Sequence, residues 1–158
     1  SAASDVYKRQ GKEFPLADVP IVQDQYTTPH EKNPFEISSS DQINLITKST
    51  EEMKKHGSSH ASGRLDFWDT EKWFFSSQGH EIYQNIVESG GGISSLSIGD
   101  GETQIRSYPQ SFGEYRTGGW EVIESFKFEN ELERLVEESN RLLTAPQCPE
   151  GTLSLIHI

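Results

Sequence analysis

The feature that most constrains the fold is the stretch from Glu81 to Trp120, in which apolar and polar residues alternate and glycine recurs. Leu96 and Ile98 alternate with serines, and the sequence Gly99-Asp100-Gly101 follows directly with turn chemistry. A side-chain period of two that ends at Asp-Gly turn residues is typical of antiparallel strands. The stretch therefore predicts a sheet, and its residue types favour a scaffold over a catalytic site.

Two segments on either side of this stretch have helical periodicity. Ser38 to His56 begins with the capping-box spacing of Ser38 and Asp41, and Gly57 follows it as a left-handed stop. Glu129 to Leu143 combines an apolar stripe with a mostly acidic outer face. We expect a helix over each segment. The expected buried stripes are Ile43, Ile46, Thr50 and Met53 in the first helix and Leu132, Leu135, Val136, Leu142 and Leu143 in the second.

The remaining periodic segments are predicted to be extended. His60 to Ser77 is expected to form a hairpin, with strands at 63–68 and 72–77 and a turn at Asp69-Thr70-Glu71. Glu121 to Phe128 is expected to form a short extended piece. The resulting order predicts an α+β fold: an antiparallel meander sheet of four to five strands with two helices packed on one face. The other face of the sheet is left open for a neighbouring domain.

Aromatic residues cluster in the predicted hairpin. They are Phe67, Trp68, Trp73, Phe74 and Phe75. Such a cluster could form a stacking platform for bases or sugars, or it could serve core packing and cross-strand pairing. Because the segment lacks a basic lining, packing and pairing are favoured.

Composition narrows the classes of function. The chain has 158 residues, a net charge of −11 and 32% hydrophobic residues, which suits one modest domain with a thin core. Because surfaces that bind nucleic acid are basic, the acidic balance argues against a nucleic-acid partner. No apolar run approaches the ~20 residues that span a membrane, so no membrane partner is expected. The single cysteine, Cys148, has no assignable activating partner and is not predicted to be a nucleophile.

Two motifs that resemble known sites are better explained as structure. His80-Glu81 lacks the second histidine one turn on that a zinc peptidase helix requires, because Gln84 and Asn85 stand there. Gly90 to Gly92 could hold a phosphate, but neither a helix nor a lysine follows directly. A bulge or a close backbone approach within the sheet is the stronger interpretation. No catalytic residue and no metal ligand is predicted.

Four residues are candidates for a cleft or an interface: Arg106, Tyr108, Tyr115 and Arg116. The two arginines stand in a segment rich in glycine and aromatic residues within a very acidic chain. They could hold a peptide carboxylate or a neighbouring subunit, or they could form ordinary surface ion pairs.

The chain divides into five segments. Residues 1–10 (SAASDVYKRQ) and 153–158 (LSLIHI) resemble translated sequencing-adapter sequence, and we expect them not to contribute to the fold. Residues 11–37 carry four of the seven prolines and are predicted to be a linker. Residues 38–145 are predicted to form the α+β domain, and residues 146–152 are predicted to start a second linker.

Four short motifs, taken in order, carry a resemblance to a known family. They are YTTP (Tyr26 to Pro29), ESGGGIS (Glu88 to Ser94), DGETQIRSYPQSFG (Asp100 to Gly113) and LLTAPQCPEGT (Leu142 to Thr152). Each motif alone is weak, but the ordered set resembles the TldD/PmbA family of metallopeptidases. The resemblance covers essentially all of residues 11–152.

The resemblance implies a cytoplasmic zinc-dependent peptidase that acts on unfolded peptides, often as a pair of related subunits. In the family, the zinc motif His-Glu-x-x-x-His lies just downstream of the segment that LLTAPQCPEGT matches. No catalytic or metal residue therefore transfers to this chain, and zinc is expected only in a longer parent. The chain resembles the non-catalytic central region, which would contact other domains of its own chain and a related subunit. The alternative is a free-standing protein- or peptide-binding module that uses the open face of its sheet.

Overall fold

The computed structural model describes residues 19–99 and 101–151, so both expected adapter segments and residues 11–18 of the predicted linker lie outside the described residues. The elements are β1 (Gln23–Thr27), η1 (Pro34–Glu36), α2 (Ser39–Lys55), β2 (His60–Phe75), β3 (Glu81–Gly99), β4 (Glu102–Tyr108), β5 (Glu114–Thr117), α3 (Trp120–Phe126), η2 (Phe128–Asn130) and α4 (Leu132–Leu142). The predicted α+β class is confirmed. The sheet is mixed, with antiparallel pairs in the majority.

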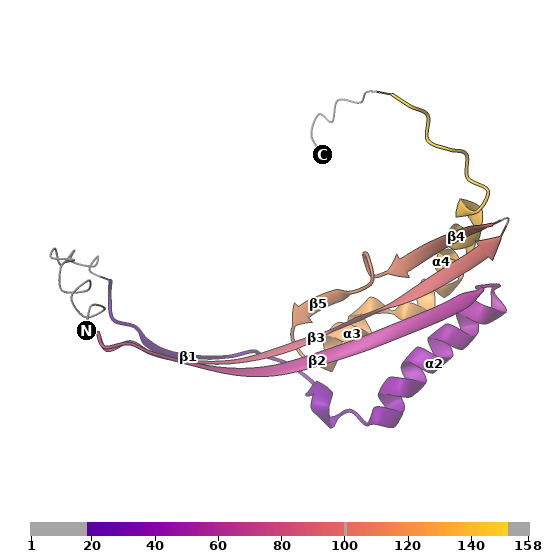
Figure 1. The fold of residues 1–158 in the computed structure, drawn as a ribbon. Helices are drawn as coiled ribbons and strands as arrows, with labels where there is room; N and C mark the ends of the chain where they lie inside the picture. The colour runs from indigo at the N-terminus through magenta and orange to yellow at the C-terminus, as the bar shows by residue number, and fades with distance from the viewer. Residues whose placement is uncertain (1–18, 100, 152–158) are drawn as a thin grey trace, which may run out of the picture.

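Strand β3 pairs with every other strand of the described sheet (Figure 1). One of its edges is occupied by β2, antiparallel, from Glu81 to Leu96. Three short strands share the other edge: β1 is parallel at 81–85, β5 is antiparallel at 88–91, and β4 is antiparallel at 93–99. The sheet is therefore a long ribbon built around one strand, and the predicted meander describes it only roughly.

Strand β1 lies in the segment that the sequence predicts to be a linker. Pro20 and Pro29 flank the strand and do not interrupt it, so every residue of β1 retains a backbone donor. Just beyond the strand, Thr28 is buried, its amide donates to the Asn85 carbonyl, and its Oγ1 accepts from the Val87 amide at 3.2 Å. The YTTP motif thus joins the sheet edge.

The predicted turn at Asp69-Thr70-Glu71 is wrong, because β2 runs without interruption for 16 residues. The chain reverses at residues 76–80, where Gly79 has φ +102° and the Gly79 amide donates to the Ser76 carbonyl. Asp69 and Glu71 lie opposite Val87 and Asn85 in the middle of the ladder. Their carboxylates accept hydrogen bonds from Asn85 and Tyr83 on β3. The acidic residues that led to the predicted turn are therefore exposed residues of a continuous strand.

The predicted extended piece at Glu121 to Phe128 is also wrong, because it forms helix α3 and the start of η2. Trp120, Ile123 and Phe126 recur at steps of three and are buried on one side of the helix. Adjacent apolar residues in so short a run fit a strand and a helix equally well, and tertiary packing decides between them. Lys127, at φ 50°, ends the helix in the left-handed conformation.

Helix α2 confirms the first predicted helix and its cap. The Asp41 amide donates to Ser38 Oγ at 3.1 Å, and Ser38 Oγ in turn donates to the Asp41 carboxylate at 2.7 Å. The predicted stripe is only partly right, because Met53 is fully buried but Ile43 is 63% exposed. Ile46 packs against the core cluster as predicted, and Leu45, which the stripe did not include, does so as well.

The core lies between the helices and one face of the sheet, so the predicted packing of two helices on one face is roughly right, although α3 is a third. It comprises Met53, Ala61, Ile93, Trp120, Val122, Ile123, Phe126, Phe128, Leu132, Leu135 and Val136. Helix α4 confirms the second predicted helix, although Leu142 is exposed. Next to this core, α4 contacts β3 through buried serines: Ser139 Oγ lies 3.0 Å from Ser95 Oγ and 2.8 Å from Ser97 Oγ. These small side chains let α4 and β3 lie close together. Because serine is polar, the sequence alone does not predict that they are buried.

The triple glycine confirms the predicted close backbone approach, and the β2–β3 register shows no bulge there. A Cβ at Gly90 would collide with the Tyr115 ring and the Glu114 carbonyl oxygen. A Cβ at Gly92 would collide with Gly113 and the Phe112 carbonyl. Glycine is therefore required where β5 and the loop before it cross close to β3.

We predict that Gly90→Ala lowers the free energy of unfolding by about 1–3 kcal/mol, the usual cost of overpacking. The physical reason is that the added methyl group would collide with the backbone of β5, which cannot move aside as the end of a flexible side chain can. Gly99→Ala is the matched control on the same strand, since its Cβ would meet only the end of the Leu143 side chain. Chemical denaturation of both variants measures the difference, and equal stability of the two would contradict the assignment.

Candidate interaction surface

The structure places the four predicted site residues on two opposite faces of the sheet. Arg106, Tyr108 and Arg116 pair with positions of β3 whose side chains face the helices. Tyr115 pairs with Gly90 and faces the other way. The four side chains are therefore not brought together in one cleft.

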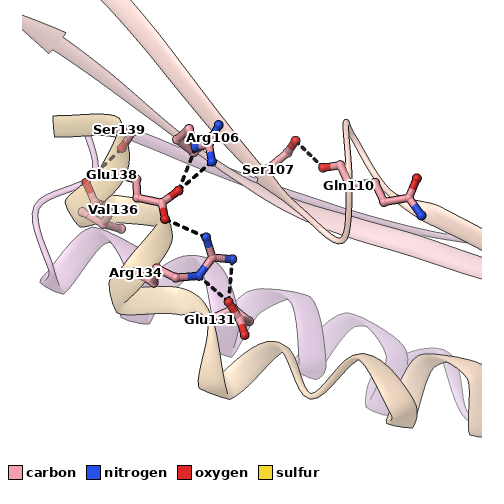
Figure 2. A network of polar contacts seen from close by, with 8 residues as sticks. All are labelled: Arg106, Ser107, Gln110, Glu131, Arg134, Val136, Glu138 and Ser139. Carbon is pink, nitrogen blue, oxygen red and sulfur yellow. Dashed lines mark hydrogen bonds and ion pairs between the residues drawn. The ribbon is translucent and has the colours of Figure 1, made fainter. Parts of the chain in front are cut away.

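Arg106 forms a charged network with helix α4 (Figure 2). Its Nε and Nη2 each lie 2.8 Å from Glu138 Oε2, while Arg134 binds Glu138 Oε1 at 2.8 Å and Glu131 at 2.6 Å. The hydrogen bond from Arg134, followed by that from Arg106, lowers the pKa of Glu138. Of the two interpretations of Arg106, this geometry fits the ion pair.

A solvent-open hollow of about 580 Å³ lies beside this network, at the C-terminal end of α4. Arg106, Glu138, Arg141, Leu142 and Pro146 contribute to its lining. Because Glu138 already neutralises Arg106, this side chain offers an incoming carboxylate a weaker site than a free arginine would.

Tyr108 and Arg116 attach the short strands to α3. The Tyr108 hydroxyl donates to the Phe126 carbonyl at 3.0 Å, and its ring packs edge-on against Phe128. Arg116 pairs with Glu114 and lies over the Phe126 ring, 5.5 Å from its centroid. Both contacts give these residues a structural role.

Tyr115 belongs to a polar and aromatic cluster on the helix-free face. Its hydroxyl accepts from Arg64 and donates to Asp66 Oδ2 at 2.9 Å, and its ring centroid lies 5.5 Å from that of Trp68. The Tyr115 ring therefore reaches from β5 across β3 to β2. The missing side chain of Gly90 makes room for it.

We call the face of the sheet opposite the helices the open face. Its exposed large apolar side chains are Trp68, Phe74, Ile98, Ile105 and Phe112. A hollow of about 340 Å³ on this face is lined by Ser62, Gly63, Arg64, Gly92, Ile93, Ser94 and Phe112. Phe112 is 65% exposed at φ 69°, and its amide donates to Ser107 Oγ at 3.0 Å.

The open face is thus the strongest candidate for an interaction surface. The sequence predicts that such a face exists and includes Tyr115 among the candidates, but it does not single out Arg64, Asp66 or Phe112. Strand alternation assigns Arg64 and Asp66 to one face once the register is known. No local sequence signal identifies Phe112 apart from its position beside Gly113.

His80, which lies in the turn at residues 76–80, has a structural role. The Val22 amide donates to His80 Nδ1 at 3.1 Å, and the His80 ring lies beside Phe74. Among residues 19–99 and 101–151 there is no group of three or more His, Cys, Asp or Glu side chains that could hold a metal ion. The described helices include none that is both long and apolar enough to cross a membrane.

Neither the models of known protein families nor the curated protein sequences match this chain.

We predict that Glu138→Gln lowers the free energy of unfolding at pH 7 by less than about 1 kcal/mol, because both ion pairs are partly exposed to solvent. A carboxylate with a lowered pKa stabilises the fold above its unfolded-state pKa, near 4.5 for Glu138. This contribution is lost as the pH falls through the lower folded-state pKa. The free energies of unfolding of Glu138→Gln and of the parent protein should therefore converge below that pH. Glu137→Gln, an exposed neighbour on α4, is the control. Chemical denaturation at several pH values measures the difference. The same pH dependence of the free energy of unfolding in Glu138→Gln and Glu137→Gln would contradict the assignment.

Proposed function

We propose that this chain is a non-catalytic interaction module, the central segment of a TldD/PmbA-like zinc metallopeptidase, and that its open face contacts a neighbouring domain or subunit. One observation carries the proposal: the helices cover one face of the sheet, while Trp68, Phe74, Ile98, Ile105 and Phe112 are exposed on the other. Exposed apolar surface of this kind marks sites of interaction.

Peptide cleavage in this proposal belongs to the rest of the parent protein. Zinc would be bound by a His-Glu-x-x-x-His motif downstream of Thr152, and unfolded peptides in the cytoplasm would be the substrate. The central segment would shape the cleft or the subunit contact. The ordered motifs YTTP, ESGGGIS, DGETQIRSYPQSFG and LLTAPQCPEGT support this parentage.

A second candidate function is a free-standing protein-binding module. It would use the same open face, with Phe112 and the Arg64–Tyr115 cluster at the contact, but the partner would be a separate protein. The two candidates differ in what the gene encodes beyond this segment.

Determining the full parent reading frame from the source DNA separates the two candidates. The peptidase parentage predicts a His-Glu-x-x-x-His sequence shortly after the segment corresponding to Thr152. A complete parent frame without this sequence would contradict the parentage and leave the free-standing module.

The open face also makes a prediction for the isolated chain. We expect concentration-dependent self-association in sedimentation velocity, because exposed apolar residues on a sheet favour association. Ile98→Lys should weaken it, whereas Ile43→Lys on the outer side of α2 should not, although the two residues are 62% and 63% exposed. Both variants should unfold within about 0.5 kcal/mol of the parent protein, as surface substitutions usually do. A monodisperse wild-type monomer with cooperative melting would count against this use of the open face.

A further inference from the structure

A second uncovered surface lies on the part of the sheet that extends beyond the helices. We call this part the distal arm; it comprises β1 (Gln23–Thr27), residues 69–75 of β2 and residues 81–87 of β3. In Figure 1 it curves away from α2, α3 and α4, and of its residues only Val87, where the arm joins the rest of the sheet, is buried. Exposed apolar surface on a sheet marks sites of interaction, so the uncovered arm is a candidate for docking.

The inner side of the arm carries three aromatic rings. It continues the face that buries Ile93 near the helices, because the β2–β3 register is unbroken and side chains alternate with a period of two. Trp73 and Phe75 stack with ring planes 4° apart and centroids at 6.2 Å, and Trp73 lies 4.3 Å from Tyr83 on β3. Trp73 is 58% exposed and Phe75 is 61% exposed.

The same side carries carboxylates without a cation. Asp69 and Glu71 precede Trp73 and Phe75 on this side of β2, Glu81 precedes Tyr83 on this side of β3, and all three carboxylates are exposed. The arm's single lysine, Lys72, lies on the opposite side, and the arm contains no arginine. Burial, together with the nearby carboxylates of Glu71 and Asp69, raises the pKa of Tyr83.

We propose that this aromatic and acidic surface docks an arginine- or lysine-bearing segment of a partner protein. A guanidinium or ammonium group over the exposed Trp73 ring gains a cation–π contact, and Glu71 and Asp69 lie beside it to pair with the charge. Arginine is expected to bind better than lysine, because its planar group stacks on aromatic faces and hydrogen-bonds carboxylates in pairs.

Charge decides against a second copy of this chain as the occupant. Two arms would bring the like-charged carboxylates of Asp69, Glu71 and Glu81 together, with no arginine or lysine on that side of either arm. The surface is also separate from the open face, so this inference does not depend on the proposed function.

The test measures binding of fluorescein-labelled peptides to the intact chain by fluorescence anisotropy. The probes are (Gly-Arg)4, (Gly-Lys)4 and (Gly-Glu)4, at low and at physiological salt. We expect saturable binding of the arginine peptide, weaker binding of the lysine peptide, and none of the glutamate peptide. Salt should weaken the binding, because the arm is exposed.

Matched variants locate the contact. Trp73→Leu and Glu71→Gln should each weaken binding of the arginine peptide at least fivefold, whereas Trp73→Phe, which keeps an aromatic face, should retain most of it. Trp68→Leu and Glu88→Gln are the controls, since they make the same changes on the opposite side of the sheet. Circular dichroism melting verifies that each variant is folded.

Three results would overturn the inference. One is equal binding by Trp73→Leu and Trp68→Leu, and another is equal binding by Glu71→Gln and Glu88→Gln, which would indicate attraction to net charge alone. The third is an absence of peptide binding together with self-association that Trp73→Leu abolishes, which would make a second copy the occupant. Ile98→Lys should leave peptide binding unchanged, so failure of the open-face proposal remains distinguishable.

Discussion

The fold depends on the backbone pairing of β3 along both of its edges. Its 19 residues hold β2 on one side and β1, β5 and β4 in succession on the other. Just beyond the C-terminal ends of β1 and β5, the Val87 amide donates to Thr28 and its carbonyl accepts from the Gly118 amide. Because buried backbone groups must be paired, these contacts keep the edge closed between the short strands. Removing any one of the short strands would expose part of β3.

The two uncovered surfaces have different causes: the helices pack on only one face of the ribbon, which leaves the open face, and they are shorter than the ribbon, which leaves the distal arm. Helices α2, α3 and α4 pack where β2, β3 and β4 run together, with Met53, Ile93 and Leu135 fully or almost fully buried between them. Ribbon beyond this core gains no burial from a helix, so its aromatic residues pair with each other or face solvent. The charged residues are distributed differently: Glu138 of α4 neutralises Arg106, whereas the carboxylates on the inner side of the distal arm share that side with no arginine or lysine of the arm.

Much of the secondary structure could be predicted because its signals are local. Helix α2 begins at its cap because Ser38 and Asp41, three residues apart, hydrogen-bond each other. Gly79 and Gly101 have positive φ and mark the chain reversals after β2 and β3. Local signals failed at Asp69 and Glu71, where turn-forming residues lie in a long ladder, and at α3, whose seven residues are too few to separate two periods. The candidate site was predicted only in part, since Arg106 and Tyr115 are close in sequence but lie on opposite faces.

The sequence by itself determined the class of fold, the glycines that allow close approach, the caps and the open face, because each follows from a period or a backbone conformation within a few residues. Only the tertiary structure decided that β1 joins the sheet and that β3 is its central strand. It also decided which side of the sheet each candidate residue faces. The physical reason is that strand register couples residues far apart in the chain, such as Tyr26 with Gln84, and a shift of one residue would reverse every side chain. The uncovered aromatic arm depends on that register and on where the helices end.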